Sequence, residues 1–334
     1  YRVSIRLNPR FVNSNCTACG DCAQVPCSEY LGDSASESLS GSQQGAYPPH
    51  PLAYPQRYVI DPRLLATADA EKVREACAYG AIDLEQRSEE ITLNVGSVIW
   101  AAGGEPFDAR RIQAYGAGRY ADVISSMDFE RMMSPTGPTA GQLIRPSDGR
   151  EARNIAFIQC AGSRDANYLR HCSGMCCMAS LRQASHVMDA RGDNAQVSVY
   201  YIDMRLSGPF EAIYRQFHED PRIRFIRSKV AEVVRDEAGN PVCRGVDTEG
   251  GGHYENVHDL VVLAVGLEPR IPEGVLPDGV SVNEGGFIES GGVNGGFFAA
   301  GVCAEAMDYQ GALRSASAAA LKAIQVVKRS ALAG

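Results

Sequence analysis

The sequence has no excess of positive charge. Its 32 Lys and Arg residues are outnumbered by 40 Asp and Glu residues, which gives a net charge of −8. A nucleic-acid-binding domain normally carries a basic face, so this balance argues against nucleic acid as a partner. The chain also lacks the roughly 18–20 consecutive apolar residues of a membrane span and opens with no secretory signal. We therefore predict a cytoplasmic protein without a direct membrane span, which would associate with a membrane only through partner subunits.

The usual glycine-rich nucleotide loop is missing as well. Residues 154–202 have the pattern of a β–α–β unit, yet no G-x-G-x-x-G follows the strand that begins near Ile155. In dinucleotide-binding domains these glycines let the backbone and a helix N-terminus approach the pyrophosphate. We therefore expect nicotinamide binding to be lost, and Asp203, near the ribose position, to be a strand-end carboxylate.

Cysteine, in contrast, is abundant and clustered. A secreted disulfide framework is usually shorter and has an even number of cysteines, so this pattern predicts metal or cluster ligation in a reducing compartment. Of the 11 cysteines, eight form two groups and three stand alone: Cys16, Cys19, Cys22 and Cys27; Cys160, Cys172, Cys176 and Cys177; then Cys77, Cys243 and Cys303.

The first group opens like a bacterial ferredoxin motif, C-x2-C-x2-C. This spacing aims three thiolates at three corners of one cubane, and Cys77, just before a Gly-Ala-Ile segment, has the setting of the distant fourth ligand. We assign one 4Fe–4S cluster to Cys16, Cys19, Cys22 and Cys77. Zinc held by the same thiolates is the alternative, although zinc prefers paired C-x2-C knuckles.

A second ferredoxin-type cluster is not expected. It would need another C-x2-C-x2-C before Cys77, and residues 61–75 contain no cysteine. Cys27, in the order Val-Pro-Cys, then has no cluster to ligate. We interpret it as a leftover buried thiol.

The second group has the spacing C-x11-C-x3-C-C. Cys160 closes a strand where a phosphate loop would lie, and Cys177 opens the following helix, whose N-terminus favours negative charge. These features fit a second 4Fe–4S cluster on Cys160, Cys172, Cys176 and Cys177. From spacing alone, a redox disulfide between Cys172 and Cys176 fits equally well, and four small core residues are a further alternative.

Three strand ends rich in small residues look like those of flavoproteins with two dinucleotide-binding domains. They are Trp100-Ala-Ala-Gly-Gly, Leu263-Ala-Val-Gly and Phe298-Ala-Ala-Gly-Val-Cys, the last followed by a predicted helix over 310–328. In such proteins the backbone approaches the ribityl phosphate, and a helix N-terminus faces the isoalloxazine. The FAD candidates are therefore Ala102, Gly103, Gly266, Gly301, Val302 and Gln310.

Together these motifs resemble the heterodisulfide reductase A subunit family, most closely the A subunit of the quinone-interacting membrane-bound oxidoreductase. The resemblance covers essentially the whole chain. It is carried by Asn8-Pro-Arg-Phe-Val-Asn, Cys16-Thr-Ala-Cys-Gly-Asp-Cys, Tyr54-Pro-Gln-Arg-Tyr-Val-Ile-Asp, Arg145-Pro-Ser-Asp-Gly, Gln159-Cys-Ala-Gly-Ser-Arg-Asp and Cys172-Ser-Gly-Met-Cys-Cys-Met. The resemblance implies that the second cysteine group ligates an unusual 4Fe–4S cluster close to FAD. It also places Arg182 where the family often has a lysine near the flavin. Arginine keeps its proton, so it would stabilise an anionic reduced flavin.

The resemblance implies an α/β fold with two dinucleotide-binding-type domains, like the flavin-dependent disulfide reductases, and an inserted ferredoxin-like unit. The expected divisions are 1–10, the end of the FAD-domain strand region; 11–90, the insertion; 91–150, FAD domain; 151–262, the second dinucleotide-type domain; and 263–334, the FAD-domain return. The family begins with a strand and G-x-G-x-x-G that hold the adenosine diphosphate of FAD. That segment is absent here, so we expect the sequence to be a fragment or incomplete.

The resulting hypothesis is an electron-transfer subunit that passes electrons between FAD, two 4Fe–4S clusters and partner subunits. The resemblance suggests as partners a second heterodisulfide-reductase-like flavoprotein and a membrane quinone-reactive subunit, in dissimilatory sulfur metabolism. The rival is a pyridine-nucleotide-disulfide oxidoreductase that uses Cys172 and Cys176 as its redox pair. A zinc-stabilised assembly subunit is the third possibility.

Overall fold

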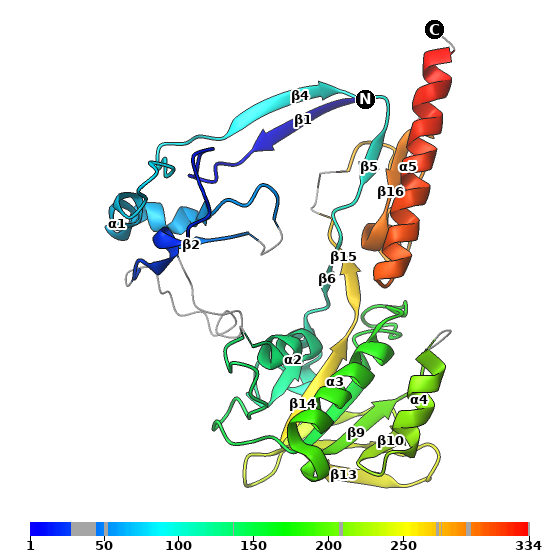
Figure 1. The fold of residues 1–334 in the computed structure, drawn as a ribbon. Helices are drawn as coiled ribbons and strands as arrows, with labels where there is room; N and C mark the ends of the chain where they lie inside the picture. Colours follow the sequence, from blue (N-terminus) through cyan, green and yellow to red (C-terminus); the bar gives the residue numbers. More distant parts are fainter. Residues whose placement is uncertain are drawn as a thin grey trace. The chain divides into compact units, whose positions relative to one another are not determined.

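A computed structural model describes residues 1–27, 45–49, 53–135, 137–206, 210–271, 274, 276–291 and 295–332. The chain divides into two compact units, Tyr1–Val95 and Gly96–Gly334. Each unit is described by itself below (Figure 1).

The first and the last strand of the first unit pair with each other. The alternating sequence at the start of the chain predicts a strand, and β1 (Arg2–Leu7) pairs antiparallel with β4 (Glu89–Asn94) along its whole length. Between them lie short elements: η1 (Asp21–Gln24), β2 (Ala46–Tyr47), β3 (Val59–Ile60), η3 (Pro62–Ala66) and α1 (Asp69–Glu75). The sequence also suggests a strand at 81–84; this prediction is wrong, because only Ile82 forms a bridge, to Val12. Residues 32–45 are rich in Ser, Gly and Gln, which predicts a loop, and all of them except residue 45 lie outside the described residues.

Cys27 is a core side chain of this unit. It is buried with Leu64 and Val73, which come from η3 and α1 in the cysteine-free segment. Packing here is close: a Cβ added at Gly45 would lie 2.9 Å from both the Cys27 sulfur and a Leu64 methyl group. Apolar side chains therefore fill the space beside Cys27, in agreement with its interpretation as a buried thiol.

The second unit contains a five-stranded sheet of order β10-β9-β8-β14-β7, in which every neighbouring pair is parallel. The predicted α/β class is confirmed. The two central strands read as continuous apolar runs because both of their faces are covered. The strands are β7 (Val123–Ser125), β8 (Asn154–Ala161), β9 (Gln196–Tyr201), β10 (Ile223–Arg227) and β14 (Leu260–Val265).

The two faces of this sheet carry different layers. On one face lie α2 (Ser126–Met133), α3 (Cys176–Arg191) and α4 (Phe210–Glu219), and their core includes Phe157 and Leu181. The other face packs against the meander β11 (Glu232–Arg235), β12 (Pro241–Val246) and β13 (His253–Val257). Cys243, one of the isolated cysteines, is fully buried in this second layer.

The remaining elements of the unit form a smaller layer. β5 (Val98–Trp100) pairs in parallel with β16 (Phe297–Ala299), and α5 (Tyr309–Leu332) packs on both strands. β6 (Gly104–Pro106) and β15 (Leu267–Pro269) pair antiparallel. Short 3-10 turns complete the unit: η4 (Ala109–Arg111), η5 (Gln113–Tyr115), η6 (Gly192–Asn194) and η8 (Gly301–Cys303). Across the described ranges, no helix has both the length and the apolar character to span a membrane.

Strand order determines where a ligand is expected. β8 lies between β9 and β14. β9 and β10 lie on one side of β8 in the sheet, and β14 and β7 lie on the other. In open α/β sheets, ligands bind outside the carboxyl ends of the strands at such a switch point. Cys160, next to last in β8, therefore lies at the expected position.

A buried polar network joins the meander to the sheet. His258 is 2% exposed; its Nδ1 lies 2.9 Å from Asn154 Oδ1, and its Nε2 accepts from the Tyr200 hydroxyl at 2.9 Å. Asn256 donates to the same hydroxyl. Because the amide oxygen only accepts, the ring is neutral with its proton on Nδ1. Burial lowers the pKa of His258 to about 4.

Because of this network, we predict that the folded protein becomes less stable in mild acid. The unfolded chain binds a proton at His258 near its ordinary pKa of about 6.5, whereas the folded chain does so only near 4. The unfolding free energy should therefore decrease by up to about 3 kcal/mol as the pH falls through this window. Urea unfolding as a function of pH should show a shallower dependence for His258→Gln than for the wild type. His253→Gln, at an exposed position of β13, is the control; equal pH slopes for all three proteins would contradict the prediction.

Candidate functional site

In the first unit, the four predicted ligands line one pocket. Cys16, Cys19, Cys22 and Cys77 all contribute to it, and it has about 330 Å³ of space, part of it open to solvent. The local sequence thus brings the distant Cys77 to the C-x2-C-x2-C turn, as its spacing predicted. The rest of the lining consists of Val12, Thr17, Gly20, Tyr58, Tyr79, Ala81 and Ile82.

The turn is held in an unusual backbone conformation. Ala18 has φ 59° and Gly20 has φ 92°, so two residues between Cys16 and Cys22 adopt the left-handed conformation. A left-handed non-glycine residue costs about 1–3 kcal/mol and is found mostly at functional sites. On the far side of the pocket, the Ala81 N–H points at the Cys77 sulfur at 3.4 Å. Such N–H contacts stabilise negative charge on a ligating sulfur.

The sulfurs of this pocket are close enough to influence one another. Burial, and then the other three cysteines, raise the pKa of the Cys22 thiol to about 11. Tyr58, which sequence reasoning missed, has its pKa raised by burial and by three of the same cysteines. Four mutually repelling thiolates require a positive centre between them, and a coordinated metal deprotonates a thiol outright.

The same pocket bears on the choice between zinc and a cluster. In a tetrahedral site with Zn–S bonds of about 2.3 Å, neighbouring sulfurs lie roughly 3.8 Å apart. Across the described residues, no three His, Cys, Asp or Glu side chains are grouped so that they would hold one metal ion. A cubane separates its cysteine sulfurs further, because irons and sulfides lie between them. The choice of a cluster over zinc at this pocket stays a prediction.

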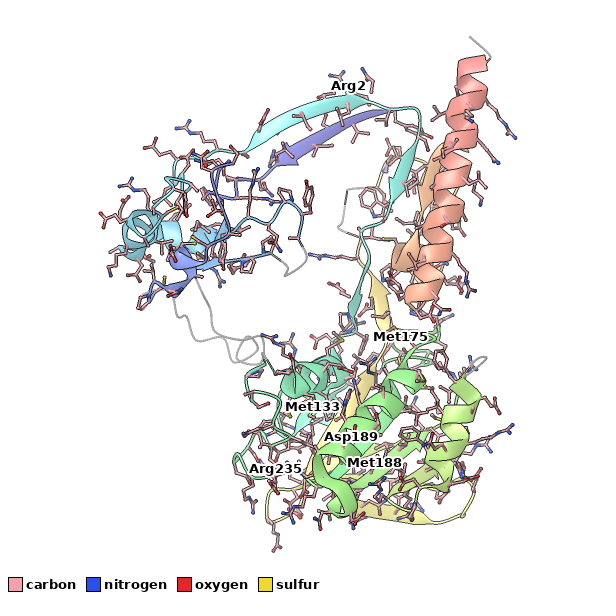
Figure 2. The ribbon with its side chains drawn as sticks, in the orientation of Figure 1. Arg2, Met133, Met175, Met188, Asp189 and Arg235 are labelled. Carbon is pink, nitrogen blue, oxygen red and sulfur yellow. The ribbon has the colours of Figure 1, made fainter. Side chains whose placement is uncertain are left out.

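In the second unit, the other four cysteines converge at the switch point of the sheet. Cys160, the next-to-last residue of β8, has φ 57°, and Cys176 and Cys177 are the first two residues of α3. Figure 2 labels Met175 at this end of α3 and Asp189 toward its other end. Burial, and then the other three thiols of the group, raise the pKa of Cys176 to about 12. Because Cys172 is one of these three thiols, it lies within electrostatic range of Cys176.

The loop between Cys160 and Cys172 is closed by backbone hydrogen bonds. Leu169 N–H donates to Gly162 O at 2.9 Å, and Arg164 N–H donates to His171 O at 3.1 Å. At its end, Gly174 N–H lies 3.4 Å from the Cys172 sulfur. The loop therefore has a defined shape of its own.

Gly266, predicted to contact flavin, lies against this loop. A Cβ at Gly266 would be 2.1 Å from Ser163 Oγ and 3.0 Å from Ser173 Oγ, so close packing requires glycine there. Ser173 Oγ also accepts from the Leu267 N–H at 2.8 Å. The end of β14 is thus fastened to the cysteine loop. A role for Gly266 toward FAD stays a prediction.

Sequence reasoning also missed Arg164. Its guanidinium is paired with Asp203, which is further bonded to Arg205 at 3.2 Å, and it lies within electrostatic range of Cys160. Asp203 is therefore more than a plain strand-end carboxylate. The position of Arg164 four residues after Cys160, in a cysteine-to-cysteine loop, was the available signal.

Most of the other flavin candidates come together where β5 and β16 end. Ala300 N–H donates to Trp100 O at 2.9 Å, just before Ala102, and the Cys303 thiol donates to Gly103 O at 3.2 Å. Val302 lies so close that a Cβ at Gly104 would be 2.3 Å from its methyl group.

Two features at these strand ends suit a bound group. Gly103 and Gly301 have φ 78° and 67°, and a Cβ added at Gly103 would meet nothing within 4 Å. The Trp100 indole N–H is buried and has no hydrogen-bond partner among the described residues. An open backbone turn and a buried donor that lacks an acceptor fit a polar ligand such as the ribityl or phosphate part of FAD.

The last two flavin candidates lie on helices. Gln310 is the second residue of α5, and its side-chain oxygen lies 3.4 Å from an Arg314 guanidinium nitrogen. Arg182 is exposed on α3, the helix that begins with Cys176. Neither position tests contact with a flavin, so both remain predictions.

The disulfide alternative finds no bond in this structure. All 11 cysteines are free. The Cys176 thiol donates to Val265 O at 3.3 Å, which directs it toward β14.

Comparison with known proteins gives one consistent group of relatives. No family model matches the sequence. The iron–sulfur A subunit of CoB–CoM heterodisulfide reductase from Methanocaldococcus jannaschii is 40% identical over 275 residues, covering 81% of this chain and 41% of that protein. One such A subunit from Methanopyrus kandleri is 35% identical over 337 residues, covering 97% of this chain and 51% of the relative. The A subunit of the ferredoxin/F420H2-dependent enzyme from Methanosarcina acetivorans is 37% identical, and the match spans 82% of this chain and 35% of the relative.

The chain thus spans between about a third and a half of the length of these relatives. Among solved structures, thioredoxin reductase of Lactococcus lactis matches with a TM-score of 0.45 and 15% identity, over 92% of this chain and 89% of the other. Thioredoxin reductase of T. acidophilum matches with the same TM-score and 14% identity, over 90% of this chain and 88% of the other.

Because only one of two buried cysteines of the first unit lines the pocket, we predict that replacing them has different effects on the iron content of the protein. Cys22→Ser should remove about four irons of a total of about eight, because it deletes a cubane ligand. Cys27→Ala should keep the iron, because Cys27 packs in the core beside Leu64 rather than lining the pocket. Iron analysis after anaerobic purification measures both. Loss of iron in Cys27→Ala with retention in Cys22→Ser would show that the ligand set is wrong.

Proposed function

Because the chain belongs to the heterodisulfide reductase A subunit family, we propose that it is an electron-transferring iron–sulfur flavoprotein within a heterodisulfide-reductase-like complex. In this proposal, FAD and two 4Fe–4S clusters supply the redox chemistry when they are bound. The chain itself positions these groups and sets their electrostatic surroundings.

The observation that carries the proposal is the convergence of two separate sets of four cysteines. One set lines a single pocket of the first unit, and the other gathers at the switch point of the parallel sheet. Ordinary core cysteines have no reason to gather in fours around strained backbone turns. Thiolate ligands and nearby N–H donors are the groups that hold an iron–sulfur cluster.

Each part of the chain has a definite role in this proposal. The N-terminus of α3 lies where negative charge would accumulate and stabilises it through its free N–H groups. Gly103, Gly301 and Val302 form a backbone cradle for the flavin, with the Trp100 indole as a donor. Arg182 would balance negative charge on a reduced flavin.

The finer parts of the proposal concern partners and metabolism. We assign the chain to a complex with a second heterodisulfide-reductase-like flavoprotein and a membrane quinone-reactive subunit. This assignment, with its link to quinone and dissimilatory sulfur metabolism, is based on the resemblance of the sequence to the quinone-interacting branch. In it, the chain is cytoplasmic and reaches the membrane through its partners.

The rival function is disulfide reduction with Cys172 and Cys176 as the exchanging pair. It would require a nicotinamide site, and the sequence after β8 carries cysteine in place of the glycine-rich loop. With all four cysteines engaged by a cluster, no dithiol remains for exchange.

The proposal predicts the metal content of protein purified without oxygen. About eight irons and about eight acid-labile sulfides per chain are expected, because each cubane contains four of each. About four irons per chain would mean that one of the two cluster assignments is wrong. Zinc without sulfide would overturn the electron-transfer function. Added NADH should leave the visible spectrum unchanged, whereas dithionite should bleach it; bleaching by NADH would favour the disulfide-reductase alternative.

A further inference from the structure

The second cysteine group presents a charge problem, given the proposed function on which this inference rests. Four thiolates around an oxidised cubane carry a net charge of about −2, and one-electron reduction adds another negative charge. Cys177 is buried and the other three cysteines are half-buried, at the end of β8 and beside the start of α3. A buried dianion needs nearby positive charge, because desolvation otherwise disfavours it strongly.

Arg164 is placed to supply that charge. Its guanidinium is paired with Asp203, which follows β9, the strand next to β8, and it lies within electrostatic range of Cys160 and Cys177. The side chain is only 20% exposed, which keeps its charge poorly screened. Among the largest electrostatic influences on the Cys160 and Cys177 thiols, Arg164 is the cationic side chain.

The backbone holds Arg164 in this position. The residue has φ 55°, a left-handed conformation that non-glycine residues seldom adopt. It is fixed there by its own N–H, which donates to His171 O at 3.1 Å across the loop. From this turn the Arg164 side chain reaches Asp203.

Asp203 is the counterpart of Arg164. It follows β9, where a dinucleotide-binding domain places a carboxylate for the ribose. Here its carboxylate is paired with Arg164 and also accepts from Arg205 at 3.2 Å. Asp203 lies within electrostatic range of Cys177, so its charge opposes that of the guanidinium.

We propose that Arg164 sets the reduction potential of the cluster held by the second cysteine group, through the positive charge that it holds beside Cys160, and that Asp203 moderates this effect. Arg164 is a positioning residue, because it acts through a ligand. A cation beside the cluster stabilises the more negative reduced form, so it raises the potential. The nearby carboxylate has the opposite influence, and the pair together defines the value.

The experiment is a redox titration of the full, cluster-loaded chain followed by electron paramagnetic resonance. A Cys16→Ser, Cys19→Ser background removes the first cluster, so the remaining signal belongs to the second group. Three variants are compared in this background: Arg164→Gln, Arg164→Lys and Asp203→Asn. Arg222→Gln is the matched control, because Arg222 pairs with Asp220 at 2.6 Å in the same sheet domain and appears among none of the influences on the cysteines.

Opposite shifts are expected from the two partners. Arg164→Gln should lower the midpoint potential relative to Arg222→Gln, and Arg164→Lys should restore most of it because the charge is kept. Asp203→Asn should raise the potential, since its amide oxygen still accepts from the arginine while the negative charge is gone. If Arg164 and Asp203 only held the loop in place, their substitution would change how much iron the protein retains. The midpoint potentials of the two variants would then not shift in opposite directions.

The outcomes separate this inference from the proposed function. If the background protein holds no iron and sulfide, the cluster assignment itself fails. If it is loaded and the potentials of all variants equal that of Arg222→Gln, the role of Arg164 is overturned. Should Arg164→Gln fail to load, the Arg164→Lys and Asp203→Asn titrations decide: no upward shift in Asp203→Asn refutes the proposal.

Discussion

The repulsion between closely placed cysteine sulfurs is the constraint on which the rest of the structure depends. In each unit, the fold gathers four thiols that raise one another's resistance to ionisation. Four thiolates at such a site need a positive centre between the sulfurs, which iron would supply in the proposed function. The strained turns at Ala18 and Cys160 are understandable in this light, because ordinary backbone conformations would aim the sulfurs apart.

The parallel sheet supplies the place for the second of these sites. A dinucleotide-binding fold leaves a crevice at its switch point, and a glycine loop normally fills it with phosphate. Here the same crevice receives thiols, and the acidic position after β9 is paired with an arginine instead of a ribose. In the proposed function, an architecture that binds a phosphate in other proteins would hold an iron–sulfur dianion here, and the N-terminus of α3 would stabilise negative charge in both cases.

Sequence reasoning succeeded where the signal was local. The apolar runs of β8 and β14, the helix at 310–328 and the C-x2-C-x2-C turn all depend on neighbouring residues, and each was found. It failed where packing decides: the half-exposed strands β12 and β13 carry no continuous apolar run, and residues 81–84 lack a pairing partner beyond one bridge. Arg164 and Tyr58 were missed because their role comes from contacts across loops, which no spacing rule encodes.

The closed loop between Cys160 and Cys172 has a consequence for assembly. Its backbone hydrogen bonds, with the attachment of Ser173 to Leu267, fix the path of the chain through the protein's own contacts. The entropy of ordering this segment is therefore lost when the domain folds. If the proposed cluster binds here, its binding does not also have to order the loop, so less of its binding free energy is offset by lost conformational entropy.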